Sequence, residues 1–161
     1  MFKIFPVVAL TAICACVPII IPVPVAAPQA PKRAISVQAP VDQAFDRQLA
    51  VLRQQAGAGP LAYNAQLARA ARGHAADMAA RGYFHHVSPE GLGAGQRAQA
   101  VGVPACGVGE NIAQGQKTSA EALAGWMASA QHRRNMLNPR MASYGLGRSG
   151  DTWVLTLYAP C

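Results

Sequence analysis

Charged side chains are scarce in this chain of 161 residues: they make up 13% of it, and only seven are acidic. The sequence also lacks the short patterns that mark well-defined chemistries, namely HExxH, CxxC, GxSxG and a Gly-rich phosphate loop. No such pattern therefore fixes a reaction. With seven acids and four His available, any catalytic or metal-binding centre must be assembled from a small set of side chains.

Length and charge limit the class of protein further. A chain of this length makes one domain with a proper core, which excludes a multidomain enzyme. Basic residues outnumber acids by 14 to 7, and removing Lys3, Lys32 and Arg33 leaves 11 against 7, a net charge of +4, for residues 41–161. This mild excess favours anionic surfaces such as lipid head groups or cell-wall polymers. Because the basic residues are scattered without interleaved aromatics, we expect no nucleic-acid partner.

The N-terminal segment is typical of an exported protein. Lys3 precedes an uncharged stretch that is interrupted by four prolines, and its best helical piece is only Val7–Val17. That piece matches the apolar region of a secretory signal and is too short for a transmembrane helix. We therefore assign residues 1–27 to a signal, 28–40 to a Pro-rich linker and 41–161 to a folded domain.

Two alternatives remain open for the same segment. One is an uncleaved membrane anchor. The other is a lipoprotein signal, because Ile13–Cys16 resembles a bacterial lipobox and Cys16 would then carry a lipid. In each case we expect a secreted, periplasmic or cell-envelope protein that contacts a membrane only through its N-terminal signal or lipid anchor.

The cysteines support an oxidising compartment. Cys14 and Cys16 belong to the N-terminal signal, which leaves Cys106 and Cys161 as an even pair in the domain. In an exported chain such a pair indicates a disulfide. Two unpaired thiols are the alternative.

Apolar spacing predicts helices followed by strands. We expect helices over residues 42–56, 64–81 and 118–130, with Asp42 and Asn64 as N-caps, Gly82 as the stop of the second and a capping box in Thr118–Glu121. Strands are expected over 143–148 and 152–159, joined by a hairpin, with a further one over 108–113. This segregated order predicts an α+β layered domain with a small antiparallel sheet.

Four residues could carry chemistry, and each has a structural alternative. His74 lies on the apolar side of the second helix and is expected to be a hydrogen-bonded core residue. His86 lies in a loop, where functional residues concentrate. Glu110 lies between glycines and could simply accept backbone hydrogen bonds. His132 is expected just after the third helix, where the helix dipole would stabilise it.

Taken together, several segments resemble the CAP superfamily (cysteine-rich secretory proteins, antigen 5 and pathogenesis-related proteins) in its bacterial SCP-domain branch. The resemblance spans roughly residues 42–159 and rests on segments in consecutive order: Pro60–Asn64, His74–Ala79, Gly82–Gly91, Gly109–Ala113, Trp126–Pro139 and Tyr144–Gly147. It implies a three-layer α-β-α sandwich.

The resemblance also implies a site. Larger members of the family place two His and two Glu around a central cavity. By position, His86 and His132 match the two His and Glu110 matches one Glu, whereas Ser129 stands where the second Glu would be. We therefore expect the His86 and His132 side chains to face each other across a cleft beside Glu110, with His85 as an additional His nearby.

A binding module is the function that these features favour. We expect an exported protein that binds a small lipid, a sterol or a cell-wall ligand through His86, Glu110, Ser129 and His132. The alternative is a metal-dependent, peptidase-like hydrolase acting on an envelope or extracellular polymer. Its cofactor would be a divalent metal such as zinc, held by His86, His132 and Glu110 with one position open to water. Because no oriented Ser–His–acid triad is evident, no catalytic residue is assigned.

Overall fold

The computed structural model describes residues 42–104 and 106–161. The chain divides into two units, Met1–Ser36 and Val37–Cys161, and all the described residues belong to the second. The predicted signal over 1–27, the Pro-rich linker over 28–40 and the lipidation of Cys16 therefore lie outside the described residues.

The domain is α+β as predicted, although its helices and strands alternate more along the chain than the segregated order that was expected. Along the described chain the elements are α1 (Gln43–Gln55), β1 (Ala62–Tyr63), α2 (Ala65–Arg81), α3 (Ala94–Ala100), β2 (Gly107–Gln114), α4 (Ser119–Ala128), α5 (Ala130–Leu137), β3 (Ser143–Ser149) and β4 (Thr152–Ala159). The predicted strands and the first two predicted helices are confirmed to within one residue at most ends. β1 and α5 were not predicted as separate elements, and one turn of helix around Arg97 was expected where α3 forms.

Local capping explains where the first two helices begin and end. The Asp42 carboxylate accepts hydrogen bonds from two backbone N–H groups of the first turn of α1, and the Asn64 side chain does the same for α2. Gly82 ends α2 in the left-handed conformation, with φ of 68°, which glycine adopts without steric cost. The predicted caps are thus confirmed.

The third predicted helix begins after Thr118 as expected, but half of its capping box and its C-terminal end differ from the prediction. Thr118 Oγ1 accepts from Glu121 N as expected, but the Glu121 carboxylate accepts from Lys117 N, so the reciprocal half of the box is shifted by one residue. The helix then breaks at Ser129, whose φ and ψ of −87° and 123° are extended. Consequently His132 lies inside a separate helix, α5, rather than after the end of one. The expected stabilisation of His132 by a helix C-terminus is therefore wrong.

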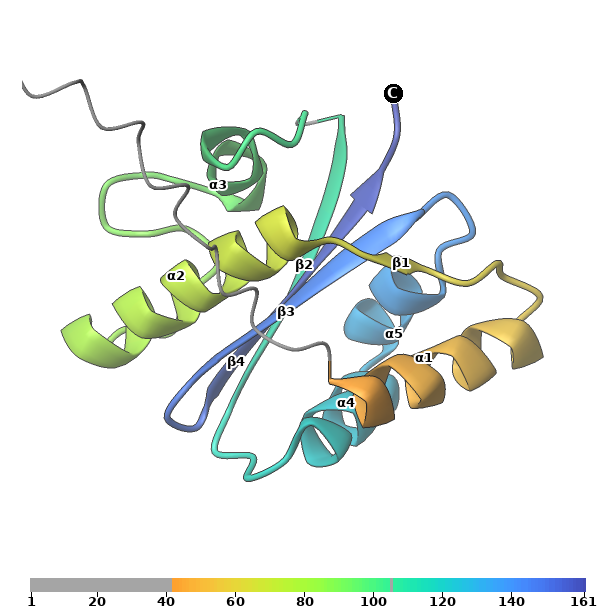
Figure 1. The fold of residues 1–161 in the computed structure, drawn as a ribbon. Coiled ribbons are helices and arrows are strands. Elements are labelled where there is room, and N and C mark those ends of the chain that lie inside the picture. Colours follow the sequence, from red (N-terminus) through yellow and green to blue (C-terminus); the bar gives the residue numbers. More distant parts are fainter. Residues whose placement is uncertain (1–41, 105) are drawn as a thin grey trace, which may run out of the picture. The chain divides into compact units, whose positions relative to one another are not determined.

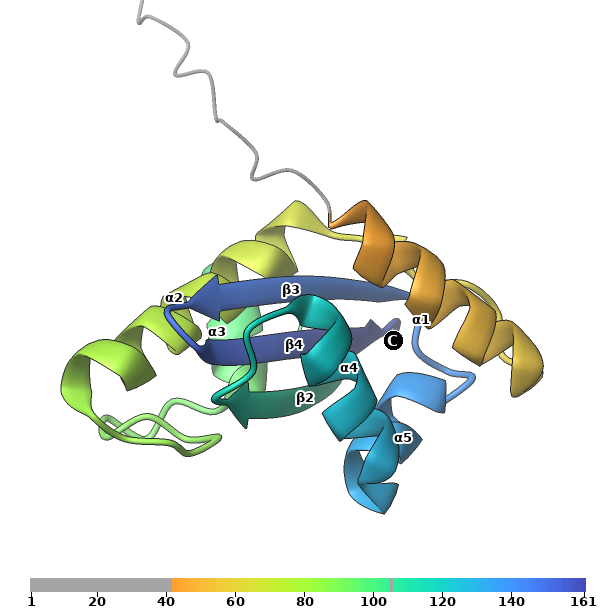
Figure 2. The same cartoon turned by 90° about the horizontal axis from the view of Figure 1, so that it is seen from below.

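The strands form one sheet in the order β1-β3-β4-β2. β4 pairs with both β2 and β3 in antiparallel fashion, whereas β1 runs parallel to β3, so the sheet is mixed rather than wholly antiparallel as expected. Figures 1 and 2 show α2 and α3 on one face of the sheet and α1, α4 and α5 on the other. The predicted α-β-α sandwich is confirmed.

The two faces of the sheet pack against their helices differently. The main core lies on the α1, α4 and α5 side, where Phe45, Trp126 and Tyr144 are buried with their aromatic rings in contact. On the opposite side, α2 comes so close to β3 that a Cβ on Gly145 would lie 2.1 Å from the backbone N of Ala68. Only glycine leaves room for such an approach.

A buried arginine joins α1 to the chain beyond α5. Arg53 is fully buried and donates hydrogen bonds to four carbonyl oxygens, those of Gly59, Met136, Asn138 and Met141. Burial lowers the pKa of its guanidinium. The hydrogen bonds satisfy a cation that has no carboxylate among the partners recorded for it in the described chain, and they fix α1 relative to the segment that follows α5.

A disulfide joins the start of β2 to the end of β4. Cys106 and Cys161 are bonded across a sequence separation of 55 residues, with their Cα atoms 5.2 Å apart. The bond lies beside the first pair of the β2–β4 ladder, Gly107 and Ala159. The predicted disulfide is therefore confirmed.

Candidate functional site

Glu110 projects from β2 toward α2. It is paired across the ladder with Thr156, while its neighbour Asn111 is paired with Leu155, which belongs to the core on the opposite face. Because successive residues of a strand point to opposite faces, Glu110 and Asn111 serve different helical layers. The Glu110 side chain is almost completely buried, with 4% of its surface exposed.

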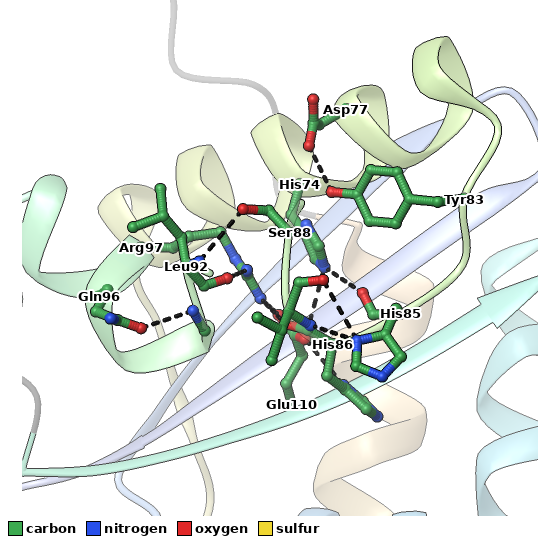
Figure 3. A network of polar contacts seen from close by, with 12 residues as sticks. His74, Asp77, Tyr83, His85, His86, Ser88, Leu92, Gln96, Arg97 and Glu110 are labelled. Atoms are coloured by element: carbon green, nitrogen blue, oxygen red, sulfur yellow. Dashed lines mark hydrogen bonds and ion pairs between the residues drawn. The ribbon is translucent and has the colours of Figure 1, made fainter. Parts of the chain in front are cut away.

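Three basic side chains surround the Glu110 carboxylate (Figure 3). His86 Nδ1 lies 3.0 Å from Oε1, and Arg97 Nη2 donates to Oε2 at 2.8 Å. His74 Nε2 lies 3.8 Å from Oε1. Both carboxylate oxygens are therefore engaged, so Glu110 acts here as an anchor for its neighbours.

Arg97 and His74 also hold the backbone of the loop that carries His86. Arg97 Nη2 donates to the carbonyl of His86 at 2.9 Å, and Arg97 Nη1 donates to that of Leu92. His74 Nε2 lies 3.0 Å from the carbonyl of His85. The loop between α2 and α3 is thus held by side chains beneath it, and His86 keeps its position next to Glu110.

Sequence reasoning did not identify Arg97 as a site residue, although it expected a turn of helix around it. A signal was present, since Arg97 is the one basic residue in the Gly-rich stretch between residues 91 and 102. His74, which was interpreted as a core residue, is indeed buried, but it also belongs to the network around Glu110.

The protonation of His74 follows from its surroundings. Burial lowers its pKa below the usual 6.5, although nearby Glu110 acts in the opposite direction. The carbonyl of His85 can only accept, so Nε2 of His74 must carry the proton. Nδ1 is then a lone-pair acceptor, and it has no hydrogen-bond partner among the described residues.

His132 is placed by Asn111 from the other face of the sheet. Asn111 Nδ2 donates to the carbonyl of His132 at 3.0 Å, and Asn135 Nδ2 donates to Asn111 Oδ1 at 2.9 Å. Burial lowers the pKa of the His132 imidazole, and the charge of His86 lowers it further. The two imidazoles are thus near enough to repel each other when both are protonated.

Two of the predicted site residues do not join Glu110 directly. No hydrogen bond or ion pair to the Glu110 carboxylate is recorded for the side chains of His132 or Ser129 in the described part of the chain. Ser129 forms the break between α4 and α5, and its side chain makes no capping hydrogen bond to α5. The geometry therefore joins His86 with Glu110, His74 and Arg97, a set that differs from the predicted one.

The predicted zinc centre does not fit this arrangement. A His₂Glu centre would need a free Glu110 oxygen, yet one oxygen is taken by His86 and the other by Arg97. Within residues 42–104 and 106–161, no three His, Cys, Asp or Glu side chains gather so that they could hold a metal ion. We therefore derive no chemistry from a bound metal.

The Glu110–His86 pair nevertheless has a defined chemical character. If the carboxylate accepts from His86 Nδ1–H, the opposite nitrogen, Nε2, is an acceptor, and the His86 side chain is 45% exposed. A carboxylate in this position fixes the tautomer and orientation of an imidazole. What the site presents to a ligand is thus an oriented imidazole edge.

A mostly apolar hollow lies elsewhere in the domain. A groove of about 510 Å³ runs between α1 and α4, on the sheet face opposite Glu110. Its walls are mostly apolar and include Val51 and Leu52 from α1 and Ala124 and Met127 from α4.

No helix within the described residues is long and apolar enough to cross a membrane.

Known proteins are similar to this chain in sequence and in fold. A family model described as "CAP: Cysteine-rich secretory protein family" matches residues 47–157. The protein YkwD of Bacillus subtilis (strain 168) is 38% identical over 104 residues, which cover 63% of this chain and 40% of YkwD.

Solved structures agree with the family match. An extracellular protein containing an SCP domain, from Bacillus anthracis str. Ames, is 31% identical with a TM-score of 0.70, covering 73% of this chain and 40% of that one. An outer surface protein from Borrelia burgdorferi shares the fold at 18% identity and a TM-score of 0.65, covering 71% of this chain and 89% of that one. The chain spans only about two fifths of the Bacillus proteins. It belongs to the cysteine-rich secretory protein (CAP) family, as a bacterial CAP/SCP-domain protein.

Proposed function

We propose that this protein is an exported module that binds an acyl lipid in the groove between α1 and α4. Export is supported by the signal-like composition of residues 1–27, the Pro-rich stretch over 28–40 and the disulfide of the domain. The related Bacillus anthracis protein is described as extracellular and the Borrelia burgdorferi protein as an outer surface protein.

The groove between α1 and α4 is the observation from which we infer the class of ligand. Its volume of about 510 Å³ falls within the range of small-molecule sites. Positions four residues apart on both helices line it, so that an apolar stripe of α4 faces Val51 and Leu52 of α1 across the groove. Val51, in its wall, is 51% exposed, so the groove offers apolar surface that a ligand can reach.

The charge at the groove selects the kind of lipid. Arg47 is the one charged residue among those that line it, and Gln48 and Gln55 supply further polar groups. No acidic side chain lines the described wall. A single acyl chain with an anionic head group matches apolar walls with one guanidinium at the edge. Sterols and cell-wall glycans, the other ligands considered from the sequence, have no comparable match to this charge pattern.

Hydrolysis is the rival function, and the Glu110–His86 pair is the observation in its favour. A hydrolase also needs a nucleophile or activated water and donors for the developing oxyanion. No Ser, Thr or Cys side chain within the described residues is recorded as a hydrogen-bond partner of His86, and the predicted zinc set does not fit. We assign His86, Glu110 and His132 instead to a polar site beside β2 that presents an oriented imidazole.

A groove-filling substitution tests the proposal. Ala124 lines the groove and is exposed, so Ala124→Trp should occupy it without disturbing the core. Ala128→Trp, also exposed on α4 but outside the groove, is the matched control. Binding would be measured by displacement of a fluorescent fatty acid and by native mass spectrometry of the purified protein.

The outcomes separate the candidate functions. Loss of fatty-acid binding in Ala124→Trp alone supports the groove. Equal binding by both variants and the wild type, or displacement by a sterol or a muropeptide but not by a fatty acid, would overturn it. Turnover of an ester or peptide substrate that disappears in His86→Ala while the melting temperature is unchanged would favour the hydrolase.

A further inference from the structure

The outer edge of β3 is covered by another strand over only part of its length. β1 pairs with β3 at Ser143 and Tyr144, and Asn64 N then donates to the carbonyl of Tyr144. The chain next turns into α2, whereas β3 continues over residues 145–149. On the side away from β4, no strand within the described residues pairs with this outer part of β3.

Backbone groups along this edge lack partners. The carbonyl of Tyr144 points outward, since it accepts from Asn64 N. Backbone groups of alternate residues in a strand point the same way, so Leu146 and Arg148 also direct their N–H and C=O groups outward. For these groups no hydrogen bond to another described residue is recorded. Unpaired N–H and C=O groups at the edge of a sheet are a template for an added strand.

A hollow lies along the same edge. Its volume is about 300 Å³, at the lower end of the range for ligand sites. Its wall includes Tyr63, the last residue of β1, and Tyr144, Leu146 and Arg148 of β3. The hollow therefore follows β3 from the point where β1 ends. It shares no lining residue with the groove between α1 and α4.

Arg72 reaches this hollow from α2 without a partner. Its backbone lies directly over β3, since a Cβ on Gly147 would be 2.2 Å from the backbone N of Arg72. Arg72 is partly buried and lines the hollow, yet no hydrogen bond, ion pair or ring contact is recorded for its side chain within the described residues. Asp42, the acid in the same wall, caps α1 instead. An unpaired guanidinium in this position favours a carboxylate as its partner.

The features that usually protect an exposed edge are missing from β3. Charged side chains and prolines commonly prevent pairing at such an edge. β3 contains no proline, and its one charged residue, Arg148, leans toward β4. The Arg148 guanidinium lies 4.6 Å from the ring centroid of Trp153 in β4, and its Nε donates to the carbonyl of Gly150. The outer part of β3 is therefore open to an incoming strand.

We propose that an extended peptide with an acidic side chain binds along the outer part of β3, in continuation of β1. Its backbone pairs with the N–H and C=O groups of Leu146 and Arg148, which is the strand-addition mode of peptide recognition. Its carboxylate pairs with the guanidinium of Arg72. One ligand thus satisfies both the unpaired edge and the unpaired cation, whereas a small anion would satisfy Arg72 alone. This inference does not depend on lipid binding in the groove.

Amide exchange in the presence of a synthetic peptide tests strand addition directly. The probe is acetyl-Thr-Val-Glu-Val-Thr-amide. At saturation it should slow hydrogen exchange at the N–H groups of Leu146 and Arg148, measured by NMR of the ¹⁵N-labelled protein. Binding without this protection would overturn the proposal. So would protection of both N–H groups in the free protein, since the edge would then already be occupied by the chain itself or by a second copy.

Methylated peptides test whether the peptide pairs as a strand. Only every second N–H of a strand faces a given neighbour. Methylating the backbone nitrogens of one alternate set of peptide residues should therefore abolish binding, and methylating the other set should not. Equal binding of both methylated peptides would exclude strand addition.

Matched variants test the pairing with Arg72. Arg72→Gln should weaken binding of the Glu peptide about tenfold and leave binding of the corresponding Gln peptide unchanged. Arg69→Gln, at an exposed arginine also on α2, is the control and should bind the Glu peptide like the wild type. Equal affinity of the wild type for the Glu and Gln peptides, or binding of acetate without binding of either peptide, would contradict the proposal.

A proline in β3 tests the edge from the side of the protein. Arg148→Pro removes an outward N–H and should abolish peptide binding, whereas Arg148→Gln keeps that N–H and should still bind. Circular dichroism checks that both variants fold; should Arg148→Pro not fold, the methylated peptides answer the same question. Full binding by a folded Arg148→Pro would refute the site.

The groove variant keeps this inference separate from the proposed function. Ala124→Trp, which occupies the groove between α1 and α4, should bind the Glu peptide like the wild type. Loss of peptide binding in Ala124→Trp would place the peptide in that groove and overturn the assignment to β3. Failure of the peptide to bind any of these proteins refutes the β3 site and leaves fatty-acid binding untouched.

Discussion

Glu110 and Asn111 are neighbours in β2, yet they bind opposite helical layers. The Glu110 carboxylate contacts Arg97 of α3 and approaches His74 of α2, whereas Asn111 bonds to α5 through the carbonyl of His132. The alternation of side chains along one strand thus positions both imidazoles of the predicted site. The predictions below follow from this arrangement and from the fold that supports it.

Arg97→Ala should destabilise the domain by roughly 3 kcal/mol, because it leaves the buried Glu110 carboxylate without its cation. It should also speed amide exchange at residues 85–92, because Arg97 holds the carbonyls of His86 and Leu92 in that loop. Urea denaturation and hydrogen exchange would measure the two effects. Arg134→Ala, at an exposed position on α5, is the control and should change neither. An unchanged exchange rate in Arg97→Ala would mean that the loop is held by other contacts.

Acidification should weaken the fold as the pH falls below about 6.5. Burial lowers the folded-state pKa of His74 and of His132 below the usual 6.5. Below pH 6.5 the unfolded chain therefore takes up protons that the folded protein does not. The free energy of unfolding consequently decreases as the pH is lowered. Above pH 6.5 the contribution of His74 and His132 to the free energy of unfolding is constant.

Denaturation curves at several pH values would show this loss, and it should be smaller in His74→Gln. Should that variant not fold, an NMR titration of the His74 ring in the wild type gives the same answer. Gly125→Ala, which changes no titratable group, provides the control and should keep the wild-type pH dependence. A His74 ring that becomes protonated above pH 6.5 contradicts the prediction.

Removing the disulfide should cost about 2–4 kcal/mol of unfolding free energy, because the bond closes a long loop in the unfolded chain. The double variant Cys106→Ser with Cys161→Ser should unfold at lower urea concentration, and the fully reduced wild type should behave like it. The same measurement on the double variant with and without reductant is the control. Equal stability of oxidised and reduced protein would show that the bond adds nothing.

The glycines of β3 should tolerate no side chain. A Cβ on Gly147 would lie 2.2 Å from the backbone N of Arg72, so Gly147→Ala must push α2 off the sheet. We expect a loss above about 4 kcal/mol and little soluble folded protein. In contrast, Gly125→Ala in α4 meets nothing within 4 Å and should gain up to about 1 kcal/mol. A cooperative, wild-type-like transition in Gly147→Ala would contradict the close packing of α2 on β3.

The features that could be predicted from the sequence are those that depend on nearby residues. Caps at Asp42 and Asn64, the stop at Gly82 and the β3–β4 hairpin each arise within a few residues, and the structure confirms them. The break at Ser129 carries no glycine or proline, so a continuous helical pattern concealed it. β1 has only two residues and depends on a partner far along the chain, since Ala62 pairs with Ser143.

The candidate site was harder to predict because its residues are far apart in the sequence and come into contact only in the folded domain. His86 and Glu110 were identified by resemblance, and the structure places them in contact. Arg97 has no pattern of its own, since its role depends on a carboxylate 13 residues later on another element. The groove between α1 and α4 was missed for a similar reason. Small and apolar side chains on two helices predict burial equally well, and only their relative placement leaves a hollow.

The carbonyl cluster around Arg53 has a consequence for what the groove can accept. One guanidinium binds four oxygen atoms from separate turns of backbone, so α1 cannot roll or slide without breaking several charge-assisted bonds at once. Because α1 forms one wall of the groove between α1 and α4, the width of this groove is fixed before a ligand binds. It should admit a slender, unbranched tail at little entropic expense and exclude broad fused rings.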